Sequence, residues 1–127
     1  MLTPSRLINP APENTYKTFE NSFLKKVIVL VEQHYDDTSF GIRELATDLW
    51  LSPSQLYRKL RALTGRSPAI FVRSLRLLKA KDLLLHTDLT ITEVAYQTGF
   101  SELTYFSHAF SVEFGVCPST FRRKYHN

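Results

Sequence analysis

Residues 67–85 read SPAIFVRSLRLLKAKDLLL, and the segment before this stretch is repeated, with small changes, after it. Ser67 is a good helix N-cap, and Pro68 suits the first helical position, where its missing N–H costs nothing. Apolar side chains then recur at helical spacing on two adjoining stripes: Phe71, Leu75, Leu78 and Leu85 on one, and Leu77, Ala80 and Leu84 on the other. The stretch predicts a single helix of about 27 Å, against which both flanking segments can pack.

The two flanking segments are copies of one module. Four residues return 49 positions later: Ile42, Glu44, Ala46 and Ser52 as Ile91, Glu93, Ala95 and Ser101. The second copy then contains one extra residue, and the spacing becomes 50: Leu56, Leu60, Gly65, Pro68 and Phe71 return as Phe106, Phe110, Gly115, Pro118 and Phe121. Two copies indicate a duplicated module and not a solenoid.

Composition restricts the class of protein. With 127 residues and 43% hydrophobic content, the chain can bury one sizeable core or two small cores that share an element. No apolar run approaches the ~18 residues of a membrane helix, and the N-terminus has no signal-peptide pattern. The single Cys117 excludes an internal disulfide and cannot alone form a cysteine-rich zinc site. We therefore expect a cytoplasmic setting and no membrane contact by this segment.

Charge is segregated along the chain, which carries a net charge of +4. From Pro53 to Lys81 there are eight basic residues and no acid: Arg58, Lys59, Arg61, Arg66, Arg73, Arg76, Lys79 and Lys81. Residues 1–48 instead hold seven acids and five bases. The basic segment favours a polyanionic partner, with a solvated helix surface as the alternative.

The pattern divides the chain into a tail and one domain. Residues 1–20 hold three prolines and no periodicity, which predicts a linker or tail. From Ser22 the sequence has one strongly apolar helical face. We assign residues 21–127 to a domain, with a first helix-turn-helix unit at about 22–66, a connecting helix at 67–86 and a second unit at about 90–127.

Each copy contains the signals of two helices joined by a tight turn. In the first copy, a helix over 42–49 is followed by a turn at Trp50 and Leu51, and Ser52 with Gln55 forms a capping box. That second helix is expected to end at Gly65 in the left-handed conformation. The fold class predicted is all-α, with two helix-turn-helix units joined by a long central helix and about seven helices in total.

The second copy repeats these signals. Thr90 and Glu93 form its capping box, and Gly99 and Phe100 form its turn. The next helix is predicted from Ser101 to about Phe114, ended by Gly115, with a closing basic helix over 118–125.

Periodicity predicts which face of each second helix points outward. Leu56, Leu60 and Leu63 are expected to face the core of the first unit, and Phe106, Phe110 and Phe114 that of the second. The outward residues are then Ser54, Gln55, Tyr57, Arg58 and Arg61 in the first unit, and Glu102, Leu103, Thr104, Ser107, His108 and Ser111 in the second. In the helix-turn-helix plan this second helix enters the DNA major groove.

Five runs of sequence carry a resemblance to a known family. They are SPSQLYRKL at 52–60, RLLKAKDLL at 76–84, ITEVAYQTGFS at 91–101, FSHAF at 106–110 and FGVCP at 114–118. Over about residues 39–125 the chain resembles the AraC/XylS-type DNA-binding domain. Together with the apolar helix before it, the chain looks most like the output domain of a bacterial two-component regulator. The resemblance implies double-stranded DNA as partner, RNA polymerase as a further candidate partner, and a receiver or sensor part preceding this chain.

The resemblance also implies positions that contact DNA. These are Ser54, Gln55, Tyr57 and Arg58 in the first unit and Leu103, Thr104, Ser107 and His108 in the second, with Arg61 expected on a phosphate. Arg58 can pair with guanine, Gln55 can read adenine or serve only its cap, and the Thr104 methyl can pack on thymine. Arg73, Arg76, Lys79 and Lys81 are expected either to meet phosphates or to cover apolar surface with their stems.

Three positions depart from the family pattern. His108 stands where an arginine is usual, Ser111 where a lysine is usual, and Trp50 where the second copy has Gly99. The second unit has therefore lost positive charge, and we expect it to attract phosphates more weakly.

Other functions find less support. The sequence has no cluster of catalytic residues and no phosphate loop, so we expect no enzyme and no cofactor. His34, His86 and His126 show no metal-ligand spacing. The alternative is a helical protein-docking module that does not bind DNA, with the apolar helix near Phe23 as its docking element.

Cys117 corresponds to Ser67 in the first copy and is expected at the N-cap of the closing helix. A serine or threonine there is expected to stabilise the second unit. The opposing interpretation is a sulfur packed beside Phe114 and Phe121 as a small hydrophobe.

Overall fold

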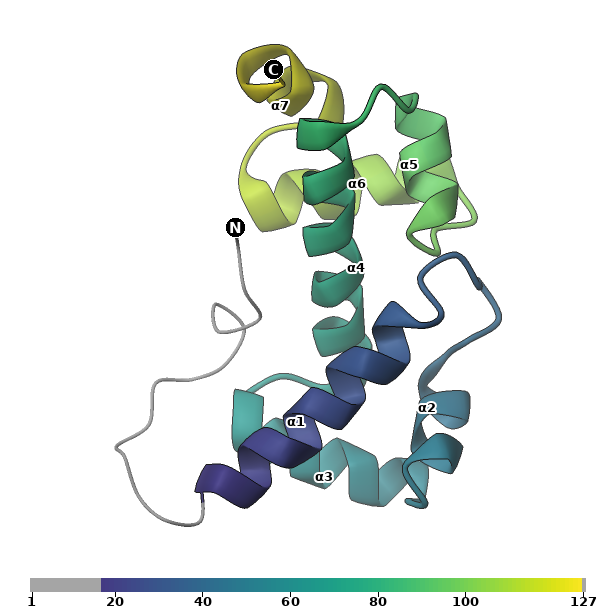
Figure 1. The fold of residues 1–127 in the computed structure, drawn as a ribbon, viewed down its shortest axis with the longest axis vertical. Coiled ribbons are helices and arrows are strands. Elements are labelled where there is room, and N and C mark those ends of the chain that lie inside the picture. The colour runs from purple at the N-terminus through teal and green to yellow at the C-terminus, as the bar shows by residue number, and fades with distance from the viewer. Residues whose placement is uncertain (1–16, 127) are drawn as a thin grey trace. The chain divides into compact units, whose positions relative to one another are not determined.

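In the computed structural model, residues 17–126 are described, and the greater part of the predicted linker, residues 1–16, lies outside this range. The described residues form seven α-helices and no strand (Figure 1), which confirms the predicted all-α class. The helices are α1 (Lys17–Glu32), α2 (Ile42–Asp48), α3 (Pro53–Thr64), α4 (Pro68–His86), α5 (Ile91–Gln97), α6 (Leu103–Phe114) and α7 (Pro118–Tyr125). None of these helices is long and apolar enough to cross a membrane.

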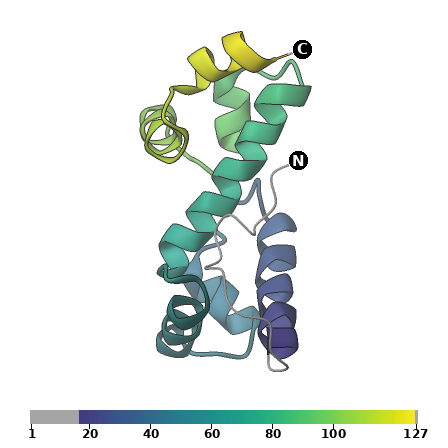
Figure 2. The same ribbon diagram turned by 90° about the vertical axis from the view of Figure 1, so that its left-hand side faces the viewer.

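The chain forms two compact units whose boundary falls inside α4. The described part of unit 1 comprises residues 17–34 and 40–75, and that of unit 2 comprises residues 35–39 and 76–126. Because α4 is one continuous helix (Figure 2), its first turns belong to unit 1 and its later turns to unit 2. The stretch that begins at Ser67 thus forms the single helix that the sequence predicts.

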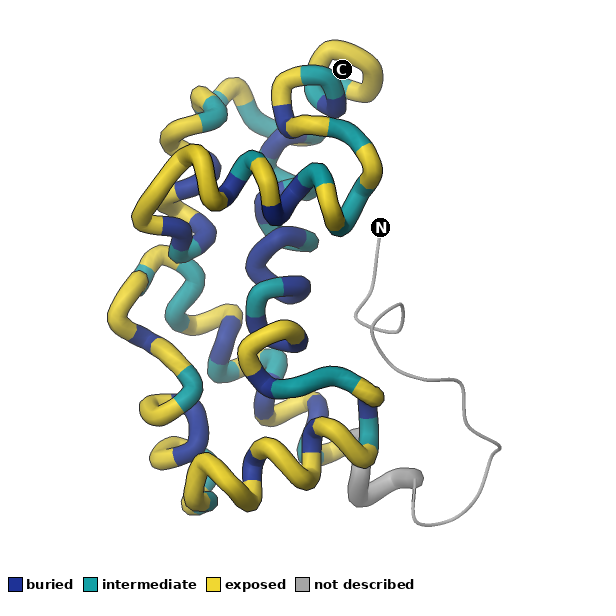
Figure 3. The backbone as a smooth tube through the Cα atoms, turned by 180° about the vertical axis from the view of Figure 1, so that it is seen from behind, coloured by how far each residue is buried: buried dark blue, intermediate teal, exposed yellow. Residues whose placement is uncertain are grey.

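Unit 1 is held together by a core of mainly aliphatic side chains. α1 contributes Val27 and Val31, which are fully buried, and α2 contributes Leu45. α3 and the start of α4 complete the core with Leu56, Leu60, Phe71, Val72 and Leu75. Along these helices buried positions alternate with exposed ones (Figure 3), as expected for amphipathic helices around one core.

Unit 2 is built around aromatic rings. Phe106 and Phe110 of α6 are fully buried, and their ring centroids lie 5.9 Å apart. Phe114 and Phe121 flank Phe110 at 4.6 Å and 5.6 Å, with tilted or edge-to-face rings. Of the three residues predicted to face the core from this helix, Phe106 and Phe110 are fully buried. Phe114 is only half-buried and lies at the edge of the core.

The predicted capping boxes are present in both units. The Ser52 hydroxyl accepts the Gln55 N–H at 3.1 Å, and the Gln55 side-chain oxygen accepts the Ser52 N–H at 2.8 Å. Thr90 and Glu93 make the same pair of bonds at 3.1 Å and 2.8 Å. Each box satisfies two backbone N–H groups that would otherwise lack a partner at a helix start.

Helix α6 begins later than predicted. It starts at Leu103 and not at Ser101, with Glu102 as an N-cap whose side chain makes no capping bond. The reason is the extra residue of the second copy, which lies before the cap and moves the helix start past Ser101. Gly65 and Gly115 end α3 and α6 in the left-handed conformation, at φ 75° and 82°, as predicted.

Arg76 on the connecting helix is not placed to meet a phosphate. Its side chain is buried, and Nη1 donates to the carbonyl of Tyr35 at 2.7 Å and to that of Thr98 at 3.1 Å. Burial lowers the pKa of Arg76, and the charge of Asp37 opposes that shift. The expectation of a phosphate contact was therefore wrong, because backbone carbonyls within unit 2 hold the guanidinium inside.

The end of α4 is capped by a side chain from α7. The Arg122 guanidinium donates to the carbonyls of Leu84 at 3.3 Å and Thr87 at 3.2 Å, and also to that of Leu89. The Leu84 carbonyl lies in the last turn of α4, where carbonyls lack an intrahelical partner, and Thr87 and Leu89 lie just beyond that turn. Arg122 is thus a structural residue of unit 2.

Gly99 lies against the Arg76 guanidinium in unit 2. Its φ is +90°, and a Cβ there would lie 1.7 Å from Nη1 of Arg76 and 2.7 Å from the backbone oxygen of Tyr35. We expect Gly99→Ala to destabilise unit 2 by at least about 3 kcal/mol, since left-handed strain of ~1–2 kcal/mol adds to the loss of charged hydrogen bonds. Urea unfolding measures the change.

Gly115→Ala is the matched control. Gly115 also has a positive φ, of +82°, but a Cβ there would meet nothing within 4 Å. It should cost only the strain, about 1–2 kcal/mol. Equal costs at the two glycines would contradict the role given to Arg76.

Cys117 occupies the predicted N-cap of α7, and its side chain makes no capping bond to the backbone. The residue is exposed, so the alternative of a sulfur buried beside Phe114 and Phe121 was wrong. Hydrogen bonds with the hydroxyls of Ser119 and Thr120 lower the pKa of the thiol to about 7. At pH 6 the thiol is neutral and is a poor acceptor for the N–H groups of the first turn.

We expect Cys117→Ser to raise the urea midpoint of unit 2 at pH 6, because a hydroxyl caps a helix better than a neutral thiol. The advantage should shrink as pH rises. A pKa lowered by folding adds stability that is present above the ordinary thiol pKa and is lost as pH falls through about 7. A lower midpoint for the serine variant at pH 6 would contradict this account of the cap.

Candidate nucleic-acid interface

The outer face of α3 is formed by the residues that the sequence predicts. Leu56, Leu60 and Thr64 are buried, which fixes the rotation of the helix. The opposite side exposes Ser54, Gln55, Tyr57, Arg58 and Arg61. Tyr57 is 47% exposed. The face therefore combines two guanidinium groups, an amide, a hydroxyl and an aromatic ring.

Gln55 has a structural role that competes with base recognition. Its side-chain oxygen accepts the Ser52 N–H at 2.8 Å. A bidentate pair with adenine uses the amide oxygen as acceptor and the amide nitrogen as donor. To pair with adenine, Gln55 would therefore have to share or break its hydrogen bond with the Ser52 N–H. Arg58 takes no part in the capping of α3.

The outer face of α6 is less polar. Leu103, Thr104 and His108 are exposed, and Ser107 is half-buried. The Ser111 hydroxyl donates to the backbone oxygen of Ser107 at 2.9 Å within the same helix. This face offers a leucine, a threonine methyl and an imidazole, which suits apolar and shape-dependent contacts to base edges.

The two helices differ sharply in charge. α3 carries Arg58, Lys59 and Arg61 and no acid, whereas α6 carries no lysine or arginine and one acid, Glu113. Lys59 points away from the outer face of α3, since its ammonium lies 4.4 Å from the centre of the Phe23 ring on α1. The positive charge of the α3 face is therefore that of Arg58 and Arg61.

Much of the remaining basic segment is engaged within the protein. Arg66 donates to the Ser74 hydroxyl at 2.8 Å, and Arg76 is buried. The Lys81 ammonium lies over the rings of Phe114 at 4.7 Å and Phe121 at 5.6 Å, which is a cation–π contact within unit 2. Lys79 approaches Asp82 at 3.8 Å. Within this segment, Arg58 and Arg61 on the outer face of α3 are therefore exposed candidates for contact with a polyanion.

A metal site is not part of this surface. Among residues 17–126, no group of three or more His, Cys, Asp or Glu side chains is placed to hold an ion. His86 and His126 instead approach single carboxylates, of Asp82 at 3.6 Å and of Asp88 at 3.3 Å.

In each unit a short helix and a tight turn precede an amphipathic helix with an exposed outer face, and one helix contributes to both cores. This arrangement defines a double helix-turn-helix domain. A family model described as a helix-turn-helix domain matches residues 45–124. The chain belongs to this family, in its AraC-type branch.

Relatives with known names and structures agree with this assignment. The HTH-type transcriptional activator RhaS of Escherichia coli (strain K12 / DH10B) is 34% identical over 109 residues, which are 84% of this chain and 39% of RhaS. The C-terminal domain of AraT, a response regulator from Geobacillus stearothermophilus, has a TM-score of 0.74 and 30% identity, covering 81% of this chain and 85% of that one.

A further neighbour was solved with DNA. The DNA-binding domain of AdpA, described as a global transcriptional factor in complex with a target DNA, has a TM-score of 0.73 and 28% identity. The match covers 80% of this chain and 90% of the AdpA domain. This chain spans less than half the length of the curated relatives that it matches. It covers 8% of histidine kinase P4 of Formosa agariphila, 42% of RhaS of Salmonella arizonae and 39% of RhaS of Escherichia coli.

Proposed function

We propose that this chain binds double-stranded DNA in a sequence-dependent way and regulates transcription, using α3 and α6 as its two major-groove helices. The observation that carries the proposal is the exposed outer face of α3, which presents Arg58 and Arg61 next to a helix-turn-helix turn. Family membership, the activator RhaS and the AdpA domain with its target DNA support it.

In this proposal α3 supplies most of the electrostatic attraction. Arg58 pairs with the O6 and N7 atoms of guanine, and Arg61 neutralises a phosphate. Ser54 and Tyr57 contact the DNA backbone or base edges. Gln55 either keeps its capping bond to Ser52 or pairs with an adenine. The absence of an acid on α3 leaves this attraction unopposed along the helix.

We propose that α6 contributes to the recognition of particular bases and adds little electrostatic attraction. The Thr104 methyl packs on a thymine methyl, Leu103 adds apolar contact, and Ser107 and His108 donate to bases or phosphates. Because α6 lacks lysine and arginine, its binding should depend on salt less than that of α3.

The proposed setting is a bacterial two-component system in the cytoplasm, as AraT suggests. Residues 1–20 would then connect a receiver or sensor part to a DNA-binding domain over residues 21–127, and RNA polymerase would be a further partner. The family is one of DNA-binding regulators, and no enzymatic activity is proposed.

A helical docking module without DNA binding is the competing function. Salt distinguishes the two, because log Kobs for B-DNA falls with log salt at a slope near −0.9 for each phosphate neutralised. Docking of a protein through the apolar face near Phe23 would weaken much less steeply over the same range, because apolar contact carries most of it.

Arg58→Ala should weaken binding to the cognate site by about 1 to 3 kcal/mol and relax the preference at one base position. The reason is the loss of a bidentate pair that only guanine can form. Selection from random DNA would give the cognate site, and fluorescence anisotropy with cognate and random duplexes would measure the change.

Arg61→Ala is the control for this substitution, since it removes a neighbouring guanidinium from the same exposed face. It should weaken cognate and random DNA about equally. If Arg58→Ala also weakened both equally, Arg58 would be a phosphate contact and not a base reader.

One monomer should protect two successive major-groove segments in a footprint, because each unit carries its own groove helix. Thr104→Glu places a carboxylate on the face of α6 and should abolish one protected segment, while Ser54→Glu on α3 should abolish the other. Hydroxyl-radical footprinting measures this. Protection of a single half-turn by the unmodified chain would refute the use of both helices.

A further inference from the structure

Trp50 is an exposed aromatic residue in a backbone conformation that disfavours it. The side chain is 94% exposed, and its φ of 61° is the only positive value at a non-glycine position among the described residues. The corresponding position of unit 2 is Gly99, with a φ of 90°. A bulky residue in this region costs about 1–3 kcal/mol, which glycine avoids. Folding alone therefore does not explain an indole at this turn.

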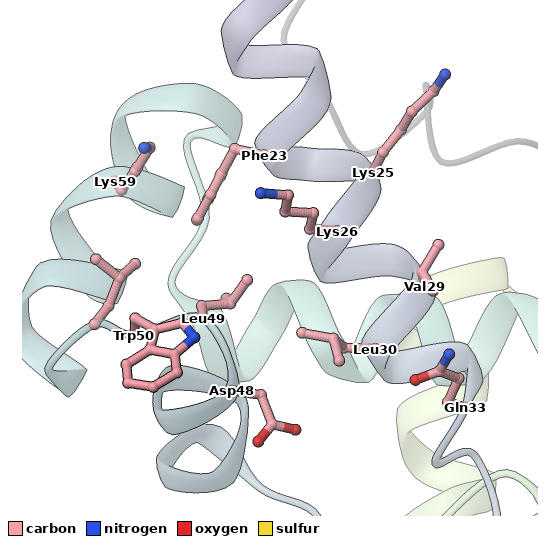
Figure 4. Close-up of a pocket in the computed structure, with 11 residues that line it drawn as sticks. Phe23, Lys25, Lys26, Val29, Leu30, Gln33, Asp48, Leu49, Trp50 and Lys59 are labelled. Atoms are coloured by element: carbon pink, nitrogen blue, oxygen red, sulfur yellow. The ribbon is translucent and has the colours of Figure 1, made fainter.

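The indole borders an apolar hollow within unit 1. The hollow has a volume of about 650 Å³ and lies between α1 and the turn that joins α2 to α3. Phe23 and Leu30 extend from α1 toward this turn, which carries Leu49 and Trp50 (Figure 4). Val29, which also lines the hollow, is 47% exposed. A hollow of this size and lining can take two or three bulky apolar side chains.

The rim of the hollow is basic. Lys25, Lys26 and Lys59 line it together with one acid, Asp48, so that its formal charge is positive. All three lysines are exposed. The Lys59 ammonium lies 4.4 Å from the centre of the Phe23 ring, which holds one positive charge directly beside the apolar wall. A matching partner combines apolar side chains with carboxylates.

We propose that this surface, made of the apolar hollow, Trp50 and the three lysines, docks an acidic amphipathic helix of a partner protein. The apolar face of that helix lies in the hollow against Trp50, and its flanking Asp or Glu side chains face Lys25, Lys26 and Lys59. Helix-in-groove recognition of this kind uses apolar anchors three and four residues apart. The exposed indole supplies a rigid aromatic anchor at the centre of the contact.

Charge and position disfavour two other occupants. A second copy of this surface would bring like charges together, which opposes self-association. DNA would gain little from an apolar hollow that also contains Asp48. The residues proposed for DNA contact lie on other positions, so docking here and binding to DNA are separable properties of the chain.

The test uses a phage-displayed library of random 12-residue peptides, selected on the full chain and counter-selected on Trp50→Gly. Trp50→Gly should fold at least as stably as the unmodified chain, because glycine tolerates the positive φ. Selected peptides should carry Asp or Glu together with apolar residues at helical spacing. Because Trp50 is the only tryptophan, its intrinsic fluorescence should change saturably when such a peptide is added.

Variants then define the contact, with a fluorescently labelled selected peptide followed by anisotropy. Trp50→Gly should weaken binding at least about tenfold, as expected for an aromatic anchor. Lys26→Glu with Lys59→Glu should weaken it by a similar factor and reduce its salt dependence. Tyr96→Ala is the matched control, since Tyr96 is an aromatic residue of unit 2 that is 52% exposed, and it should leave the affinity unchanged.

Four results would overturn the proposal. They are a selection that yields no Trp50-dependent peptide, one that yields basic or wholly polar peptides, sedimentation that shows a dimer lost on Trp50→Gly, and a loss of random-duplex affinity in Trp50→Gly. The last two would assign the surface to a second copy and to DNA, respectively.

Discussion

The buried guanidinium of Arg76 is the constraint on which unit 2 depends. A charge removed from water requires strong hydrogen bonds, and this guanidinium donates them to the backbone carbonyls of Tyr35 and Thr98. The bonds join α4 to the segment after α1 and to the end of α5. The same guanidinium occupies the space beside Gly99, so the turn before α6 has no room for a side chain. The start of α6 is thus positioned by a buried charge.

Local signals were sufficient to predict most of the fold. Ser52 with Gln55, and Thr90 with Glu93, lie three residues apart, and their bonds depend only on the first turn of one helix. Gly65 and Gly115 ended their helices for an equally local reason. The start of α6 was misplaced because one inserted residue moved the cap without leaving any capping side chain. Where the repeat was exact, prediction from the sequence succeeded.

Contacts between distant segments could not be predicted in this way. Arg76 and Lys79 lie in one basic stretch of sequence, yet the first is buried and the second lies near Asp82. Arg122 differs from Arg123 only in which side of α7 it occupies, and that side is decided by where α4 ends. The candidate interface was predictable to the level of an exposed face, since helix periodicity identified Arg58 and Thr104 as outward. Assigning a base to each side chain requires the DNA itself.

The bonds from Arg122 to the end of α4 also set an order of events during synthesis. The core of unit 1 is complete once residue 75 has left the ribosome, because every helix that it needs precedes that point. The hydrogen bonds at the end of α4 come from Arg122, which lies 36 positions beyond His86 in α7. Unit 1 can therefore fold while unit 2 is still being translated. The second half of α4 then lacks its cap until the final helix emerges, which makes unit 2 the later folding step of this chain.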